Sequence, residues 1–162
     1  MTEQQRYQVR FDWGVQGAAA VADDADVLVW LDALDAGPAP LEALPAGPAV
    51  VTTGIAGAVG TAEWILALQE RLQRRTMVAL IAAGAPRGAG VRFAAEDLLA
   101  AGAVTDALES RGIDAMSPEA AVADAAYRTL ARAASSLLAA VAHPGTPNPA
   151  GPVVARAHRE VG

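Results

Sequence analysis

Cysteine and lysine are both missing from the 162-residue chain, and aromatic residues are scarce. Without cysteine the chain can form no disulfide, thiolate nucleophile, iron–sulfur cluster or cysteine-based zinc site. Three tryptophans, two tyrosines and two phenylalanines are its only aromatic residues. The hydrophobic core must therefore be built mainly from valine, leucine, isoleucine and alanine.

The chain also lacks a surplus of positive charge and any long apolar run. Its formal net charge is -6, which argues against nucleic acid or an anionic membrane as a partner. The polar N-terminus MTEQQRYQVR has no signal-peptide hydrophobic region, and no apolar run approaches the ~20 residues that span a bilayer. We therefore expect a cytoplasmic protein, in which an anionic ligand would need local arginines.

Short apolar runs alternate with helical patterns along most of the chain. Strands are predicted at residues 6–12, 26–32, 49–53 and 77–83, and long helices at 57–75, 93–112 and 118–142. Connections through helices favour parallel strand pairing. The sequence thus predicts a single α/β domain over residues 1–142, with a three-layer α/β/α architecture and a mainly parallel central sheet of about four strands. Residues 143–162, rich in proline and glycine, are predicted to form a flexible C-terminal tail.

Residues 76–112 are the most informative stretch, because a buried-strand pattern there leads through a glycine-rich loop into a helix. The loop carries Arg87 and Arg92, and the first helical turns carry Glu96 and Asp97. Open α/β sheets bind ligands at the carboxyl ends of their strands, which is where these side chains are expected. The helix dipole alone also favours acidic residues in a first turn, so a structural role stays open.

Two further groups are weaker candidates for the same site. Thr52, Thr53 and Gly54 stand between a predicted strand and a helix, where free backbone N–H groups can bind an anion. Thr53 is equally suited to cap the helix. Asp12 ends the first predicted strand and could approach the site, or it could be a solvated carboxylate at the sheet edge. Ser117, followed by proline and glutamate, fits a helix cap and not a nucleophile.

Four short words of sequence carry a resemblance to a known family. They are VRFDWG at residues 9–14, AAG at 82–84, EDLLAAGAV at 96–104 and SPEAA at 117–121. On these words the chain resembles the 2-phosphosulfolactate phosphatase family, particularly its actinobacterial branch. The resemblance covers residues 49–127 well and the first third of the chain loosely.

The resemblance implies a hydrolase, a magnesium-dependent phosphatase whose substrate is a phosphorylated small sulfonated hydroxy acid. By that resemblance and by position, Glu96 and Asp97 would be the catalytic residues and, with Asp12, the Mg²⁺ ligands. The phosphate of this small anionic phosphoester would be bound by Arg92, Arg87, Thr52, Thr53 and Gly54.

The chain also departs from the family pattern. Ala85 replaces a glutamate, the family's asparagine is missing around residues 52–54, and the segment after Leu31 is shortened. These departures favour the alternative that the chain is a non-catalytic relative, serving as a binding or oligomerisation module. An enzyme predicts that Glu96, Asp97 and Arg92 converge in one cleft.

A binding module predicts instead an exposed apolar patch near Trp13, Trp30 or Trp64. A shortened sheet could also expose an edge strand that pairs with a second copy, which predicts a homodimer.

Overall fold

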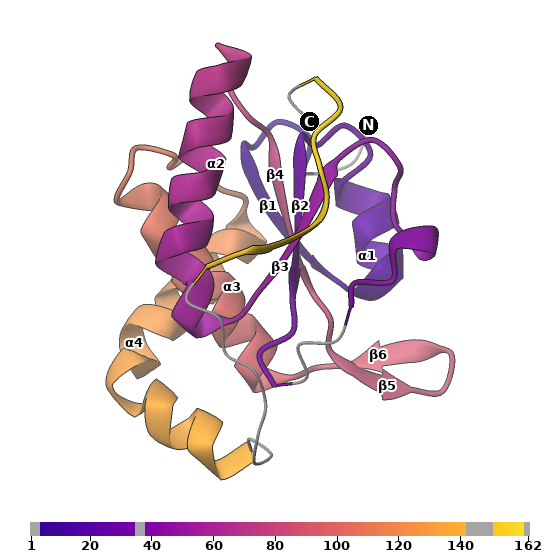
Figure 1. Ribbon diagram of the computed structural model, residues 1–162. Coiled ribbons are helices and arrows are strands. Elements are labelled where there is room, and N and C mark those ends of the chain that lie inside the picture. Colours follow the sequence, from indigo (N-terminus) through magenta and orange to yellow (C-terminus); the bar gives the residue numbers. More distant parts are fainter. Residues whose placement is uncertain (1–3, 35–37, 142–150, 161–162) are drawn as a thin grey trace.

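The computed structural model describes residues 4–34, 38–141 and 151–160, and it has an α/β architecture with one main sheet (Figure 1). The strands of this sheet are β1 (Val9–Trp13), β2 (Val27–Leu31), β3 (Ala49–Thr53), β4 (Val78–Ala82) and β7 (Val153–Arg156). Their spatial order is β1-β4-β2-β3-β7, and the first four are mutually parallel. The predicted fold class is confirmed, with five strands where about four were expected.

Helices cover both faces of the sheet, as the three-layer prediction requires (Figure 1). They are α1 (Gly14–Val21), α2 (Ala58–Leu72), α3 (Ala95–Glu109) and α4 (Pro118–Val141), with short 3-10 turns η1 (Leu41–Ala43) and η2 (Ile55–Gly57). Helix α1 packs on one face, while α2 and α3 pack on the other, with α4 against α3. None of the helices described has the length and apolarity to cross a membrane.

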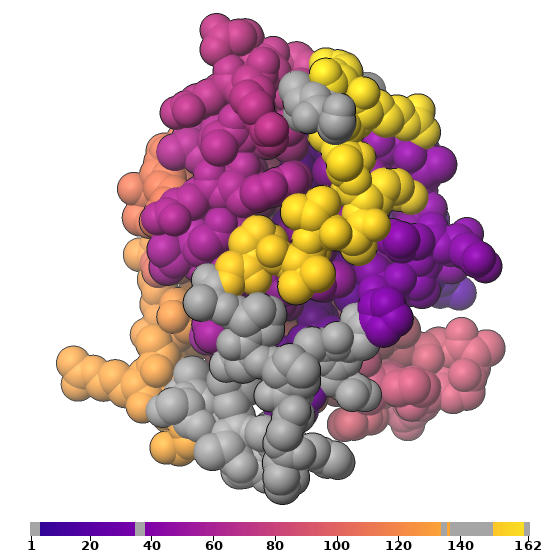
Figure 2. Space-filling model, in the orientation of Figure 1, coloured from indigo at the N-terminus to yellow at the C-terminus, as the bar shows by residue number. Residues whose placement is uncertain are grey.

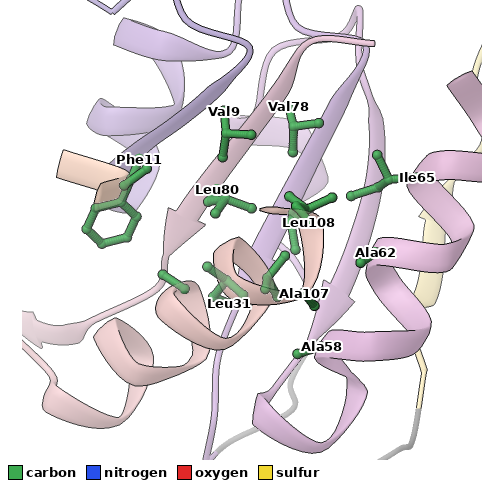
Figure 3. Close-up of a cluster of buried hydrophobic side chains, with 14 of the residues drawn as sticks. Val9, Phe11, Leu31, Ala58, Ala62, Ile65, Val78, Leu80, Ala107 and Leu108 are labelled. Atoms are coloured by element: carbon green, nitrogen blue, oxygen red, sulfur yellow. The ribbon is translucent and has the colours of Figure 1, made fainter. Parts of the chain in front are cut away.

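The larger core lies between the sheet and helices α2 and α3 (Figure 3). Side chains that alternate along the strands, such as Val78 and Leu80, meet Ile65 of α2 and Leu108 of α3 there (Figure 3). All four are fully buried. Each such aliphatic side chain contributes about 1.5–3 kcal/mol through burial. This packing fixes the direction of the strands and brings their carboxyl ends to one edge of the sheet.

Strand β7 differs from the prediction of a flexible tail over residues 143–162. Val153–Arg156 pair antiparallel with β3, and residues 151–160 lie across the surface of the molecule (Figure 2). The guanidinium of Arg156 donates to the carbonyls of Pro45 and Pro48, and His158 is buried. Residues 142–150 and 161–162 of the predicted tail lie outside the described residues. Pairing with β3 is a long-range contact, which local sequence composition does not indicate.

A two-stranded hairpin, β5 (Ala85–Arg87) and β6 (Gly90–Arg92), occupies the stretch predicted as a glycine-rich loop. It projects from the body of the molecule beyond the end of β4 (Figure 1). Val91 packs at the base of the hairpin against Gly14 and Gly84. A Cβ atom added at Gly14 would lie 2.6 Å from one Val91 methyl, and one added at Gly84 would lie 2.1 Å from the other. Both glycines have positive φ, which other residues adopt only at a cost. The hairpin therefore rests closely on backbone that has no room for side chains.

Candidate functional site

The carboxyl ends of β2 and β4 form the floor of an open cleft of about 630 Å³. Three carboxylate residues line it: Asp32, directly after β2, and Glu96 and Asp97 from the first turn of α3. The hairpin contributes part of one wall through Pro86, Gly90 and Val91. Trp30, Leu34, Pro38 and Pro40 add apolar surface. The cleft lies where open α/β sheets bind ligands.

Asp97 joins the two strand ends through its carboxylate. One oxygen accepts the backbone N–H of Ala33 at 2.9 Å, and the other accepts that of Gly84 at 2.8 Å. The residue is only 3% exposed. Its carboxylate therefore satisfies two loop N–H groups that would otherwise be buried without a partner, which is a structural role.

The charge state of Asp97 is nevertheless unusual. Burial raises the pKa of its carboxyl to about 6, against the opposing effect of the two backbone N–H bonds, and the negative charges of Asp32 and Glu96 raise it further. A carboxyl with a pKa near 6 can exchange a proton close to neutral pH, which suits acid–base chemistry. Each carboxylate oxygen also keeps a lone pair beyond the one that its N–H bond uses.

The charged residues that line the cleft are all acidic among those the structure describes, with no arginine or histidine beside them. Arg87 and Arg92 lie on the hairpin beside it, and both are exposed. Within the described part of the chain, neither arginine has an ion pair or hydrogen bond. The structure thus brings Glu96 and Asp97 together in one cleft, but it does not bring Arg92 into the lining.

The other candidate residues lie apart from the cleft. Thr52 pairs with Val153 of β7, and the buried hydroxyl of Thr53 donates to the carbonyl of Gly54 at 3.3 Å. None of residues 52–54 lines the cleft, and no side chain caps α2, whose N-cap is Gly57. Asp12 accepts the N–H of Trp13 at 2.7 Å and packs against Gly17 of α1.

Asp32 is the site residue that sequence reasoning missed. It was read only as the end of a strand, although a carboxylate directly after a buried parallel strand is placed at the ligand-binding edge. Its proximity to Asp97 depends on how α3 crosses the end of β2. That contact spans 65 positions of the chain, and no local pattern reports it.

A second acidic group tests whether the cleft is the better place for a cation. Among the described residues, Asp106, Glu109 and Asp124 form a group whose ligand atoms all lie within 4.8 Å of one another. Arg128 makes ion pairs with all three carboxylates, at 3.0 Å to Asp106 and 2.9 Å to Asp124. Its guanidinium already occupies the place of a cation between α3 and α4.

Asp32, Glu96 and Asp97 do not form such a tight group among the residues described. A divalent cation in the cleft would therefore keep part of its water shell, which is usual for Mg²⁺ in proteins. The three oxygen-bearing side chains fit that ion in ligand type, and their mutual repulsion would be relieved by it. Asp12, the remaining predicted ligand, lines a different cavity.

No match to this chain was found among protein-family models, curated proteins or solved structures.

Proposed function

We propose that the cleft binds Mg²⁺ and, together with it, a small phosphoester, so that the protein acts as a phosphatase on a phosphorylated sulfonated hydroxy acid. One observation carries the proposal. Three carboxylate residues line the cleft at the strand carboxyl ends, and within the described ranges no basic residue joins them. Such a lining repels a phosphate on its own and accepts it only together with a cation. The resemblance to 2-phosphosulfolactate phosphatases supports the same choice.

The residues would divide the work according to their surroundings. Asp32 and the half-buried Glu96 offer carboxylate oxygens to the cation. Asp97 holds the loops after β2 and β4 and, with its pKa near 6, can take up a proton close to the reacting group. When bound, Mg²⁺ supplies positive charge that stabilises the phosphoryl oxygens. Arg87 and Arg92, exposed on the hairpin beside the cleft, would contact an anion at the cleft mouth.

The test is Mg²⁺ titration of the full chain by calorimetry, followed by phosphate release from 2-phosphosulfolactate and other phosphorylated hydroxy acids. We expect Glu96→Gln and Asp32→Asn to weaken Mg²⁺ binding roughly tenfold or more and to lower phosphate release in parallel. Glu109→Gln is the matched control, because it removes one carboxylate from the group that Arg128 neutralises. It should leave both measurements unchanged.

Two results would contradict the proposal. Equal loss of Mg²⁺ binding in Glu109→Gln and Glu96→Gln would move the cation away from the cleft. Absence of any Mg²⁺ binding would leave the cleft without the charge that a phosphoester needs, and the non-catalytic alternative would take its place.

One observation favours that alternative, a binding module. The exposed apolar patch that it predicts is found near Trp13, where Phe93 is 58% exposed, Val122 64% and Val91 43%. Apolar surface gathered in this way is common at binding sites. A module without catalysis would bind its ligand there and show no phosphate release.

A further inference from the structure

A second cavity, of about 510 Å³, lies at the free side of β1 and outside the acidic cleft. Phe11 and Trp13 of β1 and Phe93, just before α3, give it three aromatic rings. The rings of Phe11 and Trp13 meet edge to face with centroids 5.6 Å apart, and those of Trp13 and Phe93 are 5.3 Å apart at a tilt of 42°. Three of the seven aromatic residues of the chain therefore gather at one cavity.

The polar residues of this cavity are acidic or already occupied. Gln4 uses its side-chain amide in two bonds with the backbone of Phe11, so it is not available to a ligand. Among the described residues the lining has two acids, Asp12 and Glu119, and no basic residue. Asp12 accepts the Trp13 N–H at 2.7 Å and packs against Gly17 of α1, whereas Glu119 is exposed. Within the described residues, neither carboxylate has a cationic partner.

We propose that this cavity binds a small organic cation, an alkylammonium or quaternary ammonium group, with the rings of Trp13 and Phe93 against the charged head and the exposed Glu119 carboxylate balancing it. Aromatic faces attract cations through their quadrupole, and acidic residues at the rim add Coulomb attraction. A neutral ligand of the same shape would lack the attraction to the Glu119 carboxylate. The volume of the cavity is that of a small-molecule site.

The site is separate from the proposed magnesium cleft. The cleft lies between the ends of β4 and β2, whereas the cavity lies at β1, the outer strand of the sheet on that side. The proposal therefore does not depend on phosphatase activity, and either can fail while the other holds.

The test uses choline as the cation and 3,3-dimethylbutan-1-ol, which has the same shape without the charge, as its neutral counterpart. The three tryptophan indole N–H groups give separate signals in a nitrogen–proton correlation NMR spectrum of the full chain, and Trp13→Phe assigns the one at the cavity. We expect choline to shift the Trp13 signal saturably and to bind roughly tenfold more tightly than the neutral alcohol.

Two variants then locate the binding. Phe93→Ala removes a largely exposed ring, and Glu119→Gln removes one charge, so both should fold. Each is expected to weaken choline binding roughly threefold to tenfold. Glu42→Gln, at an exposed glutamate of η1, should change nothing. The proposal is overturned if the neutral alcohol binds as well as choline, if Trp13 does not respond to choline, or if both cavity variants bind choline as the wild type does.

Discussion

A buried aspartate lies at each end of the central sheet, and the two aspartates differ in their hydrogen-bond partners. At the amino end, Asp26 precedes β2 and is held by two bonds from the Arg74 guanidinium, at 2.9 and 2.7 Å, and by the Met77 N–H. At the carboxyl end, Asp97 has two backbone N–H partners but no cation. Both residues are more than nine-tenths buried.

The pKa values of the two carboxyls move apart as a result. Burial by itself would raise the pKa of Asp26, but Arg74, the Met77 N–H and His158 outweigh it and lower the pKa. Burial raises the pKa of Asp97 to about 6, and two neighbouring carboxylates add to the rise. Asp26 is thus neutralised within the fold, whereas Asp97 has only backbone N–H partners among the described residues.

The arginines near the two ends of the sheet also differ in whether they are paired. Arg10 of β1 is fully buried, forms an ion pair with Asp24 and donates to the carbonyl of Val21. Its positive charge is therefore neutralised within the fold. At the carboxyl end, Arg87 and Arg92 are exposed on the hairpin and are not among the described residues that line the acidic cleft. Ion pairing at the amino end supports the fold, and we connect the group of carboxylates at the carboxyl end with binding.

The largest effect is expected from Gly84→Ala, which disturbs the carboxyl edge at the base of the hairpin. The added Cβ would lie 2.1 Å from a Val91 methyl and 2.8 Å from the Arg92 carbonyl, at a φ of +66°. Left-handed strain and overpacking together should lower the free energy of unfolding by about 3 kcal/mol. Urea unfolding measures the loss.

Gly88→Ala is the matched control for that change. Gly88 has a φ of +58° but nothing within 4 Å of an added Cβ. Gly88→Ala should lower the free energy of unfolding only through backbone strain, by about 1 kcal/mol. Equal losses in the two variants would show that the hairpin base is not closely packed on Gly84.

The next effect comes from removing the neutralised carboxylate of the amino end. Asp26→Ala leaves Arg74, the Met77 N–H and His158 without their shared acceptor, and should lower the free energy of unfolding by about 2 kcal/mol. Part of the Arg74 contribution is screened by solvent, since its side chain is 45% exposed. Chemical denaturation at neutral pH checks the value. Asp23→Ala, at an exposed neighbour, should stay within about 0.5 kcal/mol of wild type, and a similar loss there would refute the argument.

A smaller effect is expected in the pH dependence of stability. The folded Asp97 carboxyl binds its proton with a pKa of about 6, above its value in the unfolded chain. Folding therefore gains free energy as pH falls through 6, and this gain is absent above it. In EDTA, wild type should gain about 1 kcal/mol over Asp97→Asn between roughly pH 7 and 5.

Asp26 should act in the reverse sense and at lower pH. Its folded pKa is lowered, so its contribution is present above about pH 4 and is lost as pH falls further. Denaturation curves of wild type and Asp97→Asn across this range separate the two groups. If the free energies of unfolding of wild type and Asp97→Asn change in parallel between pH 7 and 5, the charged Asp97 carboxylate does not destabilise the folded protein.

The smallest effect is the change in the pKa of Asp97 when one neighbouring charge is removed. Burial is the main cause of the raised value, and Glu96 adds a lesser part. Glu96→Gln should therefore lower the pKa of Asp97 slightly, as followed by its carboxyl carbon signal in NMR. An unchanged or higher pKa would place the Glu96 charge too far away to share a cation with Asp97.

Three strands of the parallel sheet could be predicted from the sequence because each is a short apolar run, and β1 because apolar and polar residues alternate along it. Glu96 and Asp97 could be placed at the carboxyl ends of the strands because the strand and the helix on either side of them are both evident in the local sequence. The rest depends on contacts between distant residues. Asp32 meets Asp97 only after α3 has packed on the sheet, and Val153–Arg156 become a strand only by pairing with β3.

Asp12 is a residue that its position in the sequence suggested for the site but that the structure does not bring to the cleft. It follows the same rule of position as Asp32, at the end of a parallel strand, but β1 is the outer strand and its side chain packs against Gly17 of α1. Position along the chain does not tell which elements surround a strand-end residue when the strand order is unknown.

The central claim is that the carboxyl-end cleft carries negative charge for a divalent cation. The most direct test is an NMR titration of the Asp97 carboxyl carbon with and without Mg²⁺, with Asp26 observed in the same sample. We predict a midpoint of about 6 for Asp97 without the ion, a clearly lower midpoint with it, and no change for Asp26. An Asp97 midpoint that Mg²⁺ does not move would contradict the account.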